Sequence, residues 1–535
     1  MPTSLHGSSL WARICLLLCI SSLSLAGCMK VGPDFRKPQT ASPTSWMESD
    51  YARTRPDIPP AEDWWKTLND PVLDNLVATA RGQNLTLHIA GVRILEARAQ
   101  LGIAVGNIYP QTQQGVGALT YTQASQRNPG APQPPNDGKG QFTYWQDSAG
   151  FQAAWELDFW GKFRRAIESA DASLAASVAD YDNVLVSLSS DVASTYVLLR
   201  VSEERLRIAR DNVVLQREGW NIADIRFRLG ATSERDVMQA LTLLSSTEAT
   251  IPVLTSSVHK ARHALALLLG MTPEEIAPLL EGQSRIPECP EQVGVGIPAD
   301  LLRRRPDVRQ AEYQAAAQCA NIGVAKADLF PSFSLTGNIG WLSSNMGAFN
   351  LADIFSARSL TAGFGPSVTW NLFNYGRIVN NVRVQDARFE AALLNYRNTV
   401  LTALKQVEDS LADYQFTRLQ AVDLARAADA AKRGADLAFI QYKEGKTDYT
   451  TVIVAQQTQL TQQDALASAQ GNIVLGMVGL YRGLGGGWEQ RPEPVPAAVA
   501  GEMKARTSWG SMLNTAPEKY EDPAKAPAGR LAPGF

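Results

Sequence analysis

Strict alternation of apolar and polar residues sets four segments of the chain apart from the rest. Between Phe151 and Phe159 the odd positions are mostly aromatic or aliphatic, and the even positions carry Gln152, Glu156 and Asp158. A period of two with one apolar and one polar face is typical of a β-strand. The pattern predicts strands at 111–125, 141–159, 331–342 and 360–373. Lengths of about 10 to 13 residues suit tilted strands that cross a membrane.

A soluble β-sandwich would show the same alternation. Two features favour a membrane: only four such segments occur in 535 residues, and aromatic residues stand near their ends, at Tyr144, Trp145, Trp341 and Trp370. Four strands cannot close a barrel, since the smallest single-chain examples use about eight. Because open strand edges in lipid leave backbone groups unpaired, we expect several copies of the chain to share one barrel.

Two very long helices are predicted from the absence of helix-breaking residues. No Gly or Pro occurs between Gly161 and Gly219, or between Gly376 and Gly434. Each run of about 57 residues would span about 85 Å as a helix. Within the second run apolar residues mostly follow the 4-3 spacing of a coiled coil, at Leu393, Tyr396, Val400, Leu404, Val407, Leu411 and Tyr414. We expect returning helices at 233–269, kinked at Pro252, and at 448–484, which complete two antiparallel hairpins.

Strands and helices recur at a fixed interval. Trp155 is followed 215 residues later by Trp370, and Gly230-x-Thr232 by Gly445-x-Thr447. Such self-similarity indicates a duplicated unit. We predict repeats at 66–280 and 301–488, joined by a linker at 281–300. At the two Gly corners, Gly230 and Gly445 can end one helix, and a nearby hydroxyl or carboxylate can cap the next.

The ends of the chain indicate export. Arg13 precedes an apolar run that ends in Leu25-Ala26-Gly27-Cys28, which predicts a signal peptide at 1–27. Cys28 resembles a bacterial lipobox cysteine, and the alternative is an ordinary signal with a chance cysteine. Residues 28–65 would then be a lipidated N-terminal segment. The Pro-, Ala- and Glu-rich stretch 489–535 predicts a disordered periplasmic tail.

Composition excludes several function classes. The formal net charge is −3, so no surface for nucleic acid is indicated. His259 and His263 stand four residues apart but lack an acidic partner, so we expect no metal site, no cofactor and no catalytic site. Cys289 and Cys319 could form a disulfide in an oxidising compartment or remain two inert thiols.

Specific stretches resemble the TolC-like outer-membrane factor family, in its lipoprotein efflux branch of the OprM and NodT type. They are Val31-Gly-Pro-Asp-Phe35, Trp64-Trp65, Ile297-Pro-Ala-Asp300 with Arg303-Arg-Arg305-Pro-Asp307, and Leu480-Tyr-Arg-Gly-Leu-Gly-Gly-Gly-Trp488. The resemblance covers nearly all of the mature chain up to Trp488.

The resemblance implies an α+β membrane protein in the outer membrane. Three chains would share a 12-stranded barrel, continued across the periplasm by a coiled-coil helical barrel. This homotrimer would be a passive duct for small molecules, working with a periplasmic adaptor and an inner-membrane transporter. The exported substrate is not encoded in any motif that we recognise.

The resemblance also assigns roles to residues of the two corners. The periplasmic tip, which contacts the adaptor, would comprise Gly230, Thr232, Ser233, Gly445, Thr447 and Asp448. Constriction candidates are Gln239, Tyr449, Thr451 and Val454, although Val454 stands where many relatives carry Asp. The alternative is that these four are ordinary surface residues of the coiled coil.

Overall fold

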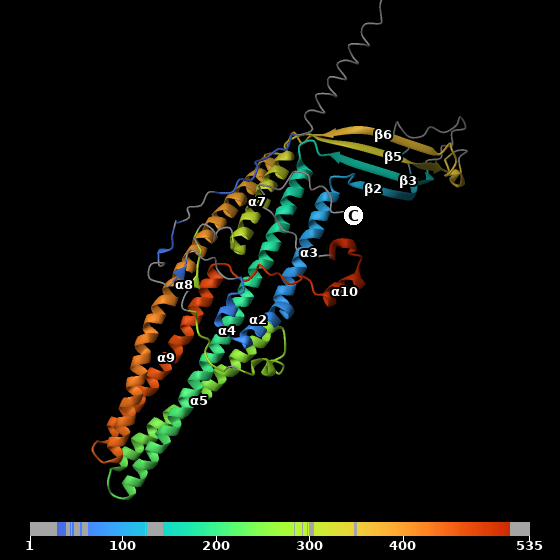
Figure 1. The fold of residues 1–535 in the computed structure, drawn as a ribbon. Helices are drawn as coiled ribbons and strands as arrows, with labels where there is room; N and C mark the ends of the chain where they lie inside the picture. Colours follow the sequence, from blue (N-terminus) through green and yellow to red (C-terminus); the bar gives the residue numbers. More distant parts are fainter. Residues whose placement is uncertain are drawn as a thin grey trace, which may run out of the picture.

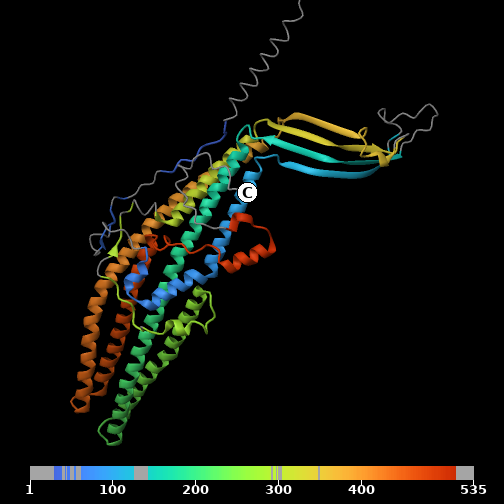
Figure 2. The same cartoon turned by 45° about the vertical axis from the view of Figure 1, so that its right-hand side comes forward.

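A four-stranded sheet projects from one end of a long helical body in the computed structural model (Figure 1). Two helical hairpins run side by side to the opposite end, as the rotated view also shows (Figure 2). The structure describes residues 29–513, apart from most of 39–61 and 124–142 and shorter gaps at 283, 291–292, 297, 299–303 and 347–349. The predicted signal peptide, Cys28, and all of residues 127–140 between the first two predicted strands lie outside the described residues.

The helices and strands have the following bounds. The α-helices are α2 (Pro71–Gln83), α3 (Leu85–Gly106), α4 (Lys162–Arg228), α5 (Glu234–Leu269), α7 (Pro306–Ala327), α8 (Arg377–Lys443), α9 (Tyr449–Gly483) and α10 (Ala497–Arg506). The large sheet contains β2 (Thr112–Gln123), β3 (Thr143–Leu157), β5 (Ser332–Ser344) and β6 (Leu360–Thr369). A short parallel pair is formed by β1 (Thr54–Arg55) and β4 (Val293–Gly294), and short 3-10 turns include η2 (Trp64–Leu68) and η5 (Gly510–Leu513).

The large sheet is antiparallel with strand order β2-β3-β5-β6. Its strands coincide with the alternating segments of the sequence, and the predicted α+β fold class with four strands and long helices is confirmed. Within the described residues β2 and β6 are edge strands with no further neighbour in the sheet.

The helical body is built on α4 and α8, each 67 residues long. Both helices continue past Gly219 and Gly434 to the corners, so they are longer than the predicted runs. One stretch of α4 is apolar enough to cross a membrane by composition, but 61% of it is buried inside the protein. That burial is typical of a core helix. Helix α5 is continuous through Pro252.

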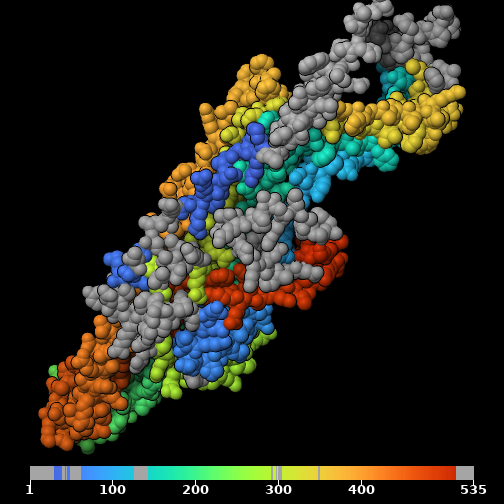
Figure 3. Space-filling model, turned by 45° about the horizontal axis from the view of Figure 1, so that its top comes forward, coloured from blue at the N-terminus to red at the C-terminus, as the bar shows by residue number. Residues whose placement is uncertain are grey.

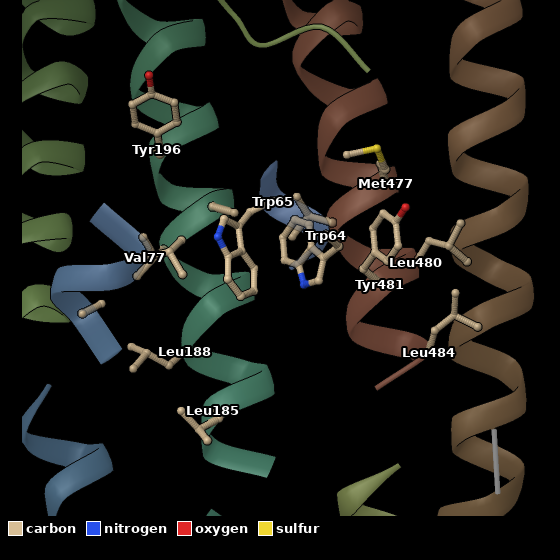
Figure 4. Packing of buried hydrophobic residues seen from close by; sticks show 14 of the residues in the cluster. Trp64, Trp65, Val77, Leu185, Leu188, Tyr196, Met477, Leu480, Tyr481 and Leu484 are labelled. Carbon is tan, nitrogen blue, oxygen red and sulfur yellow. The ribbon is translucent and has the colours of Figure 1, made fainter. Parts of the chain in front are cut away.

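The main core lies midway along the body, where both repeats meet. Trp64 stacks on Tyr481 of α9 with ring centroids 5.3 Å apart, and Trp65 packs edge-on against Trp64 (Figure 4). Leu185 and Leu188 of α4 belong to the same cluster. Asp70 caps α2 by accepting from the amides of Val72 and Leu73 and also accepts from the hydroxyl of Tyr196 at 2.6 Å, which fixes α2 against α4.

The prediction of a disordered tail over 489–535 is wrong for its first part. Arg491 donates two hydrogen bonds of 2.6 Å to the buried carboxylate of Asp182, and α10 buries Met503 against Leu95 of α3. Figure 3 shows this C-terminal segment (red) on the surface beside the N-terminal helices (blue). The composition predicted disorder because a Pro-rich segment has no hydrophobic periodicity of its own. This segment is ordered by contacts with residues of α3 and α4, which lie far away in the sequence. Residues 514–535 lie outside the described part.

Candidate functional site

The register of the sheet separates a polar face from an apolar face. Gln114 pairs with Gln152, and Gln152 pairs with Asn338, so three amides form one row across β2, β3 and β5. The adjacent row on the opposite face pairs Gly115 with Phe151 and Phe151 with Ile339. Continued along all four strands, this alternation gives one face of mainly amides, hydroxyls and Gly and another of mainly aliphatic and aromatic residues.

The apolar face is openly exposed in the single chain. Phe151 is 66% exposed and Phe364 is 83% exposed. Large exposed apolar surfaces of this kind mark contact with lipid or another protein. Because the other face is polar, the sheet fits a barrel wall with lipid outside and water inside.

The junction between strands and helices is built twice in the same way. The indole of Trp155 donates to the carbonyl of Ile108 at 3.0 Å, and the indole of Trp370 donates to the carbonyl of Leu329 at 3.1 Å. Both the tryptophans and their acceptors correspond between the predicted repeats. Trp160 adds a third bond, to the carbonyl of Pro331 at 2.8 Å. These bonds anchor the ends of the strands to the helical body.

A charged cluster surrounds the same junction. Lys162, at the start of α4, lies 2.9 Å from Asp328 and 3.9 Å from Glu156. The carboxylate of Asp158 accepts from the amide of Phe163 and from Arg164. Burial tends to lower the pKa of Lys162, but its bond to Asp328 and the nearby carboxylates raise that pKa overall, so the ammonium stays charged.

The segment from Lys30 to Lys37 is docked between α4 and α7, and we call it the N-terminal strap. Its anchor is Arg165, whose side chain is 1% exposed. The Arg165 guanidinium donates to the carbonyls of Val31 and Gly32, both at 3.1 Å, and to the carboxylate of Asp34 at 2.8 Å. The strap amide of Val31 donates to the carbonyl of Trp160 at 3.1 Å. The sequence of the strap is distinctive, but nothing in the sequence predicts that Arg165 is its buried partner.

The four long helices form a row in the order α5-α4-α9-α8. Helix α5 packs on α4, α4 on α9, and α9 on α8, so α5 and α8 are the edges of the row. Both edges carry exposed apolar side chains: Met238, Leu241 and Val253 on α5, and Leu394, Leu401, Phe416, Leu419, Val422 and Ile440 on α8.

The two corners adopt the expected glycine geometry. Gly230 and Gly445 have φ values of 72° and 73°, a left-handed conformation that favours glycine. Each corner closes by a pair of backbone bonds, for example from Gly230 to Phe227 and from Ala231 to Arg226, both 2.8 Å. Sequence spacing therefore located both helix ends correctly.

Capping differs between the corners. Asp448 caps α9 by accepting from the amide of Thr451 at 3.1 Å and from its hydroxyl at 2.8 Å. These bonds lower the pKa of Asp448. Ser233 makes no side-chain bond to the helix backbone, so the expected hydroxyl cap is wrong there. Instead, Thr232 and Ser233 both donate to the carboxylate of Asp236.

The four constriction candidates occupy different environments. Tyr449 is 1% exposed and packs edge-on against Tyr442 with centroids 4.9 Å apart, so it does not present a free surface in this conformation. Burial raises the pKa of its hydroxyl. Val454 is 58% exposed, Thr451 is exposed and Gln239 is half-buried.

Contacts between α4 and α8 join the two hairpins near the corners, and the sequence pattern did not predict them. Arg226 near the end of α4 donates to the carbonyl of Tyr442 on α8 and lies over its ring, 4.6 Å from the centroid. Lys443 forms an ion pair with Glu218 at 2.8 Å. No periodic signal distinguishes Arg226 from other charged residues of a coiled coil, because its partner lies 216 residues away.

The cysteines and histidines considered as candidate disulfide or metal-binding residues form no disulfide and no metal-binding cluster among the described residues. Both Cys289 and Cys319 are free thiols, and burial raises their pKa values to about 12 and about 11. His259 and His263 are exposed on α5 with ring centroids 6.3 Å apart. Arg305 is buried and donates to the carboxylate of Asp307 and to the carbonyl of Gly483, so its charge is neutralised within the helical body.

Comparison with known proteins places this geometry in a family. The family model for the outer membrane efflux protein matches residues 76–271 and 297–486. Nodulation protein T of Rhizobium leguminosarum bv. trifolii is 31% identical over 450 residues, covering 84% of this chain and 92% of that protein. The pyoverdine export outer membrane protein OpmQ of Pseudomonas aeruginosa is 31% identical over 470 residues, covering 88% and 96%.

A solved structure gives the same result. The outer-membrane channel OprN is similar with a TM-score of 0.79 at 33% identity, covering 86% of this chain and 100% of that chain. The resemblance inferred from the sequence motifs is thereby confirmed. The chain belongs to the outer membrane efflux protein family, and it is an outer-membrane channel protein.

Proposed function

We propose that three copies of this chain form a passive duct of a tripartite efflux system. The duct would cross the outer membrane as a barrel and extend through the periplasm as a ring of helices. The observation that carries the proposal is that, in the described part of the chain, the sheet ends in the edge strands β2 and β6, and the row of four long helices ends in α5 and α8, which carry exposed apolar side chains. In lipid, an unpaired strand edge costs several kcal/mol for each unsatisfied group, so β2 and β6 need partners from other copies.

The internal repeat indicates which helices of neighbouring copies would pack together. Helix α8 corresponds to α4, and α5 corresponds to α9. Helices α4 and α9 pack within one chain, but α8 and α5 lie at opposite edges of the row. The equivalent packing of α8 would therefore be made with α5 of the next copy. Such head-to-tail contacts generate a closed ring when the rotation closes.

Three copies would place twelve strands around the barrel. The polar face, with its row of Gln114, Gln152 and Asn338, would line the lumen, and Phe151 would face lipid. An acylated Cys28, two residues before the docked strap, would hold its lipid close to the barrel base. The corners Gly230, Thr232, Ser233, Gly445, Thr447 and Asp448 would meet the periplasmic adaptor.

We infer that the chain itself performs no catalysis and uses no cofactor. Energy and substrate choice would come from the inner-membrane transporter and its adaptor. The relatives support this division, because their names specify cargoes as different as pyoverdine and toluene. We therefore propose small molecules as the exported class.

In the resting duct, the hairpin ends would form the narrowest part. Val454 and Thr451 are exposed just beyond the second corner and would line it, with Gln239 beyond the first. A ring containing Val454 would discriminate little by charge and could exclude water when it narrows. Tyr449 would contribute by holding α9 against α4.

Planar-bilayer recording tests the proposal. We expect trimers with a small conductance, and a larger conductance for Arg226→Ala, which loses the bond between the hairpins. Arg207→Ala is a matched control, because the ion pairs of Arg207 with described residues are those with Glu204 and Asp211 of its own helix. A folded monomer in mild detergent, or trimers that never conduct in the Arg226→Ala variant, would refute the duct.

A further inference from the structure

The segment after Trp488 lies on the same face of α3 that the N-terminal strap occupies on α7. The two helices correspond to each other in the internal repeat, because Gly102-Ile-Ala104 matches Gly323-Val-Ala325 at an interval of 323 − 102 = 221 residues. Each helix is 22 residues long, and the bounds of the two are offset by the same interval. The contacts of α3 and α7 can therefore be compared position by position.

Three positions of α7 contact the strap, and their three counterparts on α3 contact the C-terminal segment. The positions on α7 are Glu312, Ala316 and Gly323, and the counterparts on α3 are Gly91, Leu95 and Gly102. On α7, Lys37 of the strap pairs with Glu312 at 2.6 Å. One turn further along, Phe35 packs against the cluster that contains Ala316.

On α3 the C-terminal segment takes the corresponding places. A Cβ atom at Gly91 would collide with the carbonyl oxygen of Pro494, so this position needs glycine for the backbone of the segment to approach. Leu95 is fully buried in a cluster with three residues of the segment, Val495, Met503 and Leu513. The same helix face is thus covered by the beginning of the chain in one repeat and by its end in the other.

The third position shows that the strap lies between two helices. A Cβ atom at Gly32 would collide with the Cα of Gly323 on α7 and would lie 3.8 Å from the Nε of Arg165 on α4. On α3, a Cβ atom at Gly102 would lie 3.4 Å from the methyl group of Met512. Met512 therefore holds on α3 the place that Gly32 holds on α7.

Within one chain, the C-terminal segment has no second helix comparable to α4. Helix α10 and the residues after it lie on the side of α3 that faces away from α4 (Figures 1 and 2). At the interval of 215 residues, the counterparts of Arg165 and Ala179 on α4 are Asn380 and Leu394 on α8. Arg165 and Ala179 are buried, whereas Asn380 is exposed and Leu394 is 54% exposed. This face of α8 is open in the single chain where the same face of α4 is covered.

We propose that residues 494–513 form a C-terminal clasp, which is seated on α3 of its own chain and contacts α8 of the neighbouring copy around Asn380. Helix α7 packs on α4 within one chain, so the equivalent packing of α3 is with α8 of the next copy. Met512 then lies between Gly102 of its own chain and Asn380 of the neighbouring copy, as Gly32 lies between Gly323 and Arg165. This inference rests on the proposed trimeric duct and identifies a segment that joins its copies.

A cysteine pair tests the clasp in the full-length protein. Cys289 and Cys319 are first replaced by Ala. Oxidation of the variant with Met512→Cys and Asn380→Cys should link copies into a covalent trimer on denaturing gels, and reductant should release them. Gly501→Cys with Asn380→Cys is the matched control. Gly501 is exposed on α10 with no described atom within 4 Å of its Cβ position, and α10 is seated at the level of Leu95, about two turns of α3 from Gly102. The control should link at least about tenfold more slowly.

A second pair separates failure of the clasp from failure of the trimer. Gln310 of α7 donates to Asp180 of α4 at 3.1 Å, and the counterparts of these two residues are Ile89 on α3 and Asn395 on α8. Ile89→Cys with Asn395→Cys should therefore link copies without involving the clasp. A trimer in which the pair at positions 512 and 380 does not link, or links no faster than the control, would overturn the inference. If neither pair links copies and the protein is monomeric, the trimeric duct itself fails.

The stability of the trimer gives an independent measurement. Met512→Asp places a carboxylate where an apolar side chain would be buried between copies, so trimers should dissociate about tenfold faster in warm detergent. Gly501→Asp adds the same charge on the exposed side of α10 and should leave the dissociation rate unchanged. Equal rates for the Met512→Asp variant and the unmodified protein would contradict the clasp.

Discussion

Removal of the Arg165 side chain is expected to release the N-terminal strap from the helical body. Arg165→Met keeps most of the apolar length of the side chain but removes the donors to Val31, Gly32 and Asp34. Breaking a buried charged pair typically costs 3–5 kcal/mol. Asp34 is largely exposed and Glu168 is about one-third exposed, so we reduce the expected loss to about 3 kcal/mol.

Amide hydrogen exchange measures this loss directly. The reporter is the amide of Val31, which bonds the carbonyl of Trp160 at 3.1 Å. A local opening that is easier by about 3 kcal/mol should speed its exchange about 100-fold under conditions where closing is fast. Arg165→Lys should give an intermediate rate, because an ammonium cannot replace the guanidinium fork.

Arg164→Met is the matched control. Arg164 precedes Arg165 in the chain and carries the same charge, but among the described residues its hydrogen bonds go to Asp158 and not to the strap. Its exchange profile over residues 30–37 should match that of the unmodified protein. Exchange at Val31 that rises by only a few-fold in Arg165→Met, or equally in both variants, would refute the assignment of Arg165 as the anchor.

Two further predictions concern the tip. Gly219→Ala places a methyl group 2.6 Å from the hydroxyl of Tyr449, so it should push α4 and α9 apart and increase conductance. The corresponding Gly434→Ala meets no atom of the described part of its own chain within 4 Å, so it should leave the packing of α4 on α9 unchanged. Asp448→Ala should speed exchange at the start of α9, whereas Ser233→Ala should not affect α5, since only Asp448 caps its helix. The bonds to Thr451 lower the pKa of Asp448, so the stabilisation of α9 by this cap is present at neutral pH and is lost as the pH falls below the ordinary value of 3.8. At such low pH, amide exchange at the start of α9 in the unmodified protein should approach that of the Asp448→Ala variant.

The strands of the sheet were predictable because the alternation of apolar and polar residues that they require is a local property of the sequence. A strand with one face in lipid must alternate at every position, and a shift of one residue would reverse both faces. The observed strand β3, Thr143–Leu157, thus lies within the predicted segment 141–159. The great length of α4 and α8 was also predictable, because the absence of Gly and Pro over a long run can be read directly from the sequence.

Long-range partners of polar residues were not predictable. Gln216 and Arg165 look like surface residues in any short window, yet both are 1% exposed. Their burial depends on α9 and on the strap, which are distant in sequence. The ordered segment after Trp488 was missed for the same reason, because Arg491 is held by Asp182 of α4.

Divergence between the repeats gives the ring a property that exact duplication could not give. With identical repeats, a trimer would contain six equivalent seams between hairpins, and nothing would determine which of them part. Because Gln216 and Gln456 stand where the other half of the repeat has Ala431 and Leu241, three seams of a trimer would differ from the other three. The tip contact of Arg226 lies across the boundary between the two hairpins of one chain, because Arg226 of α4 donates to the carbonyl of Tyr442 on α8. In the proposed ring, contacts of this kind would join the two hairpins of each copy, whereas the copies would be joined by the exposed apolar side chains of α5 and α8.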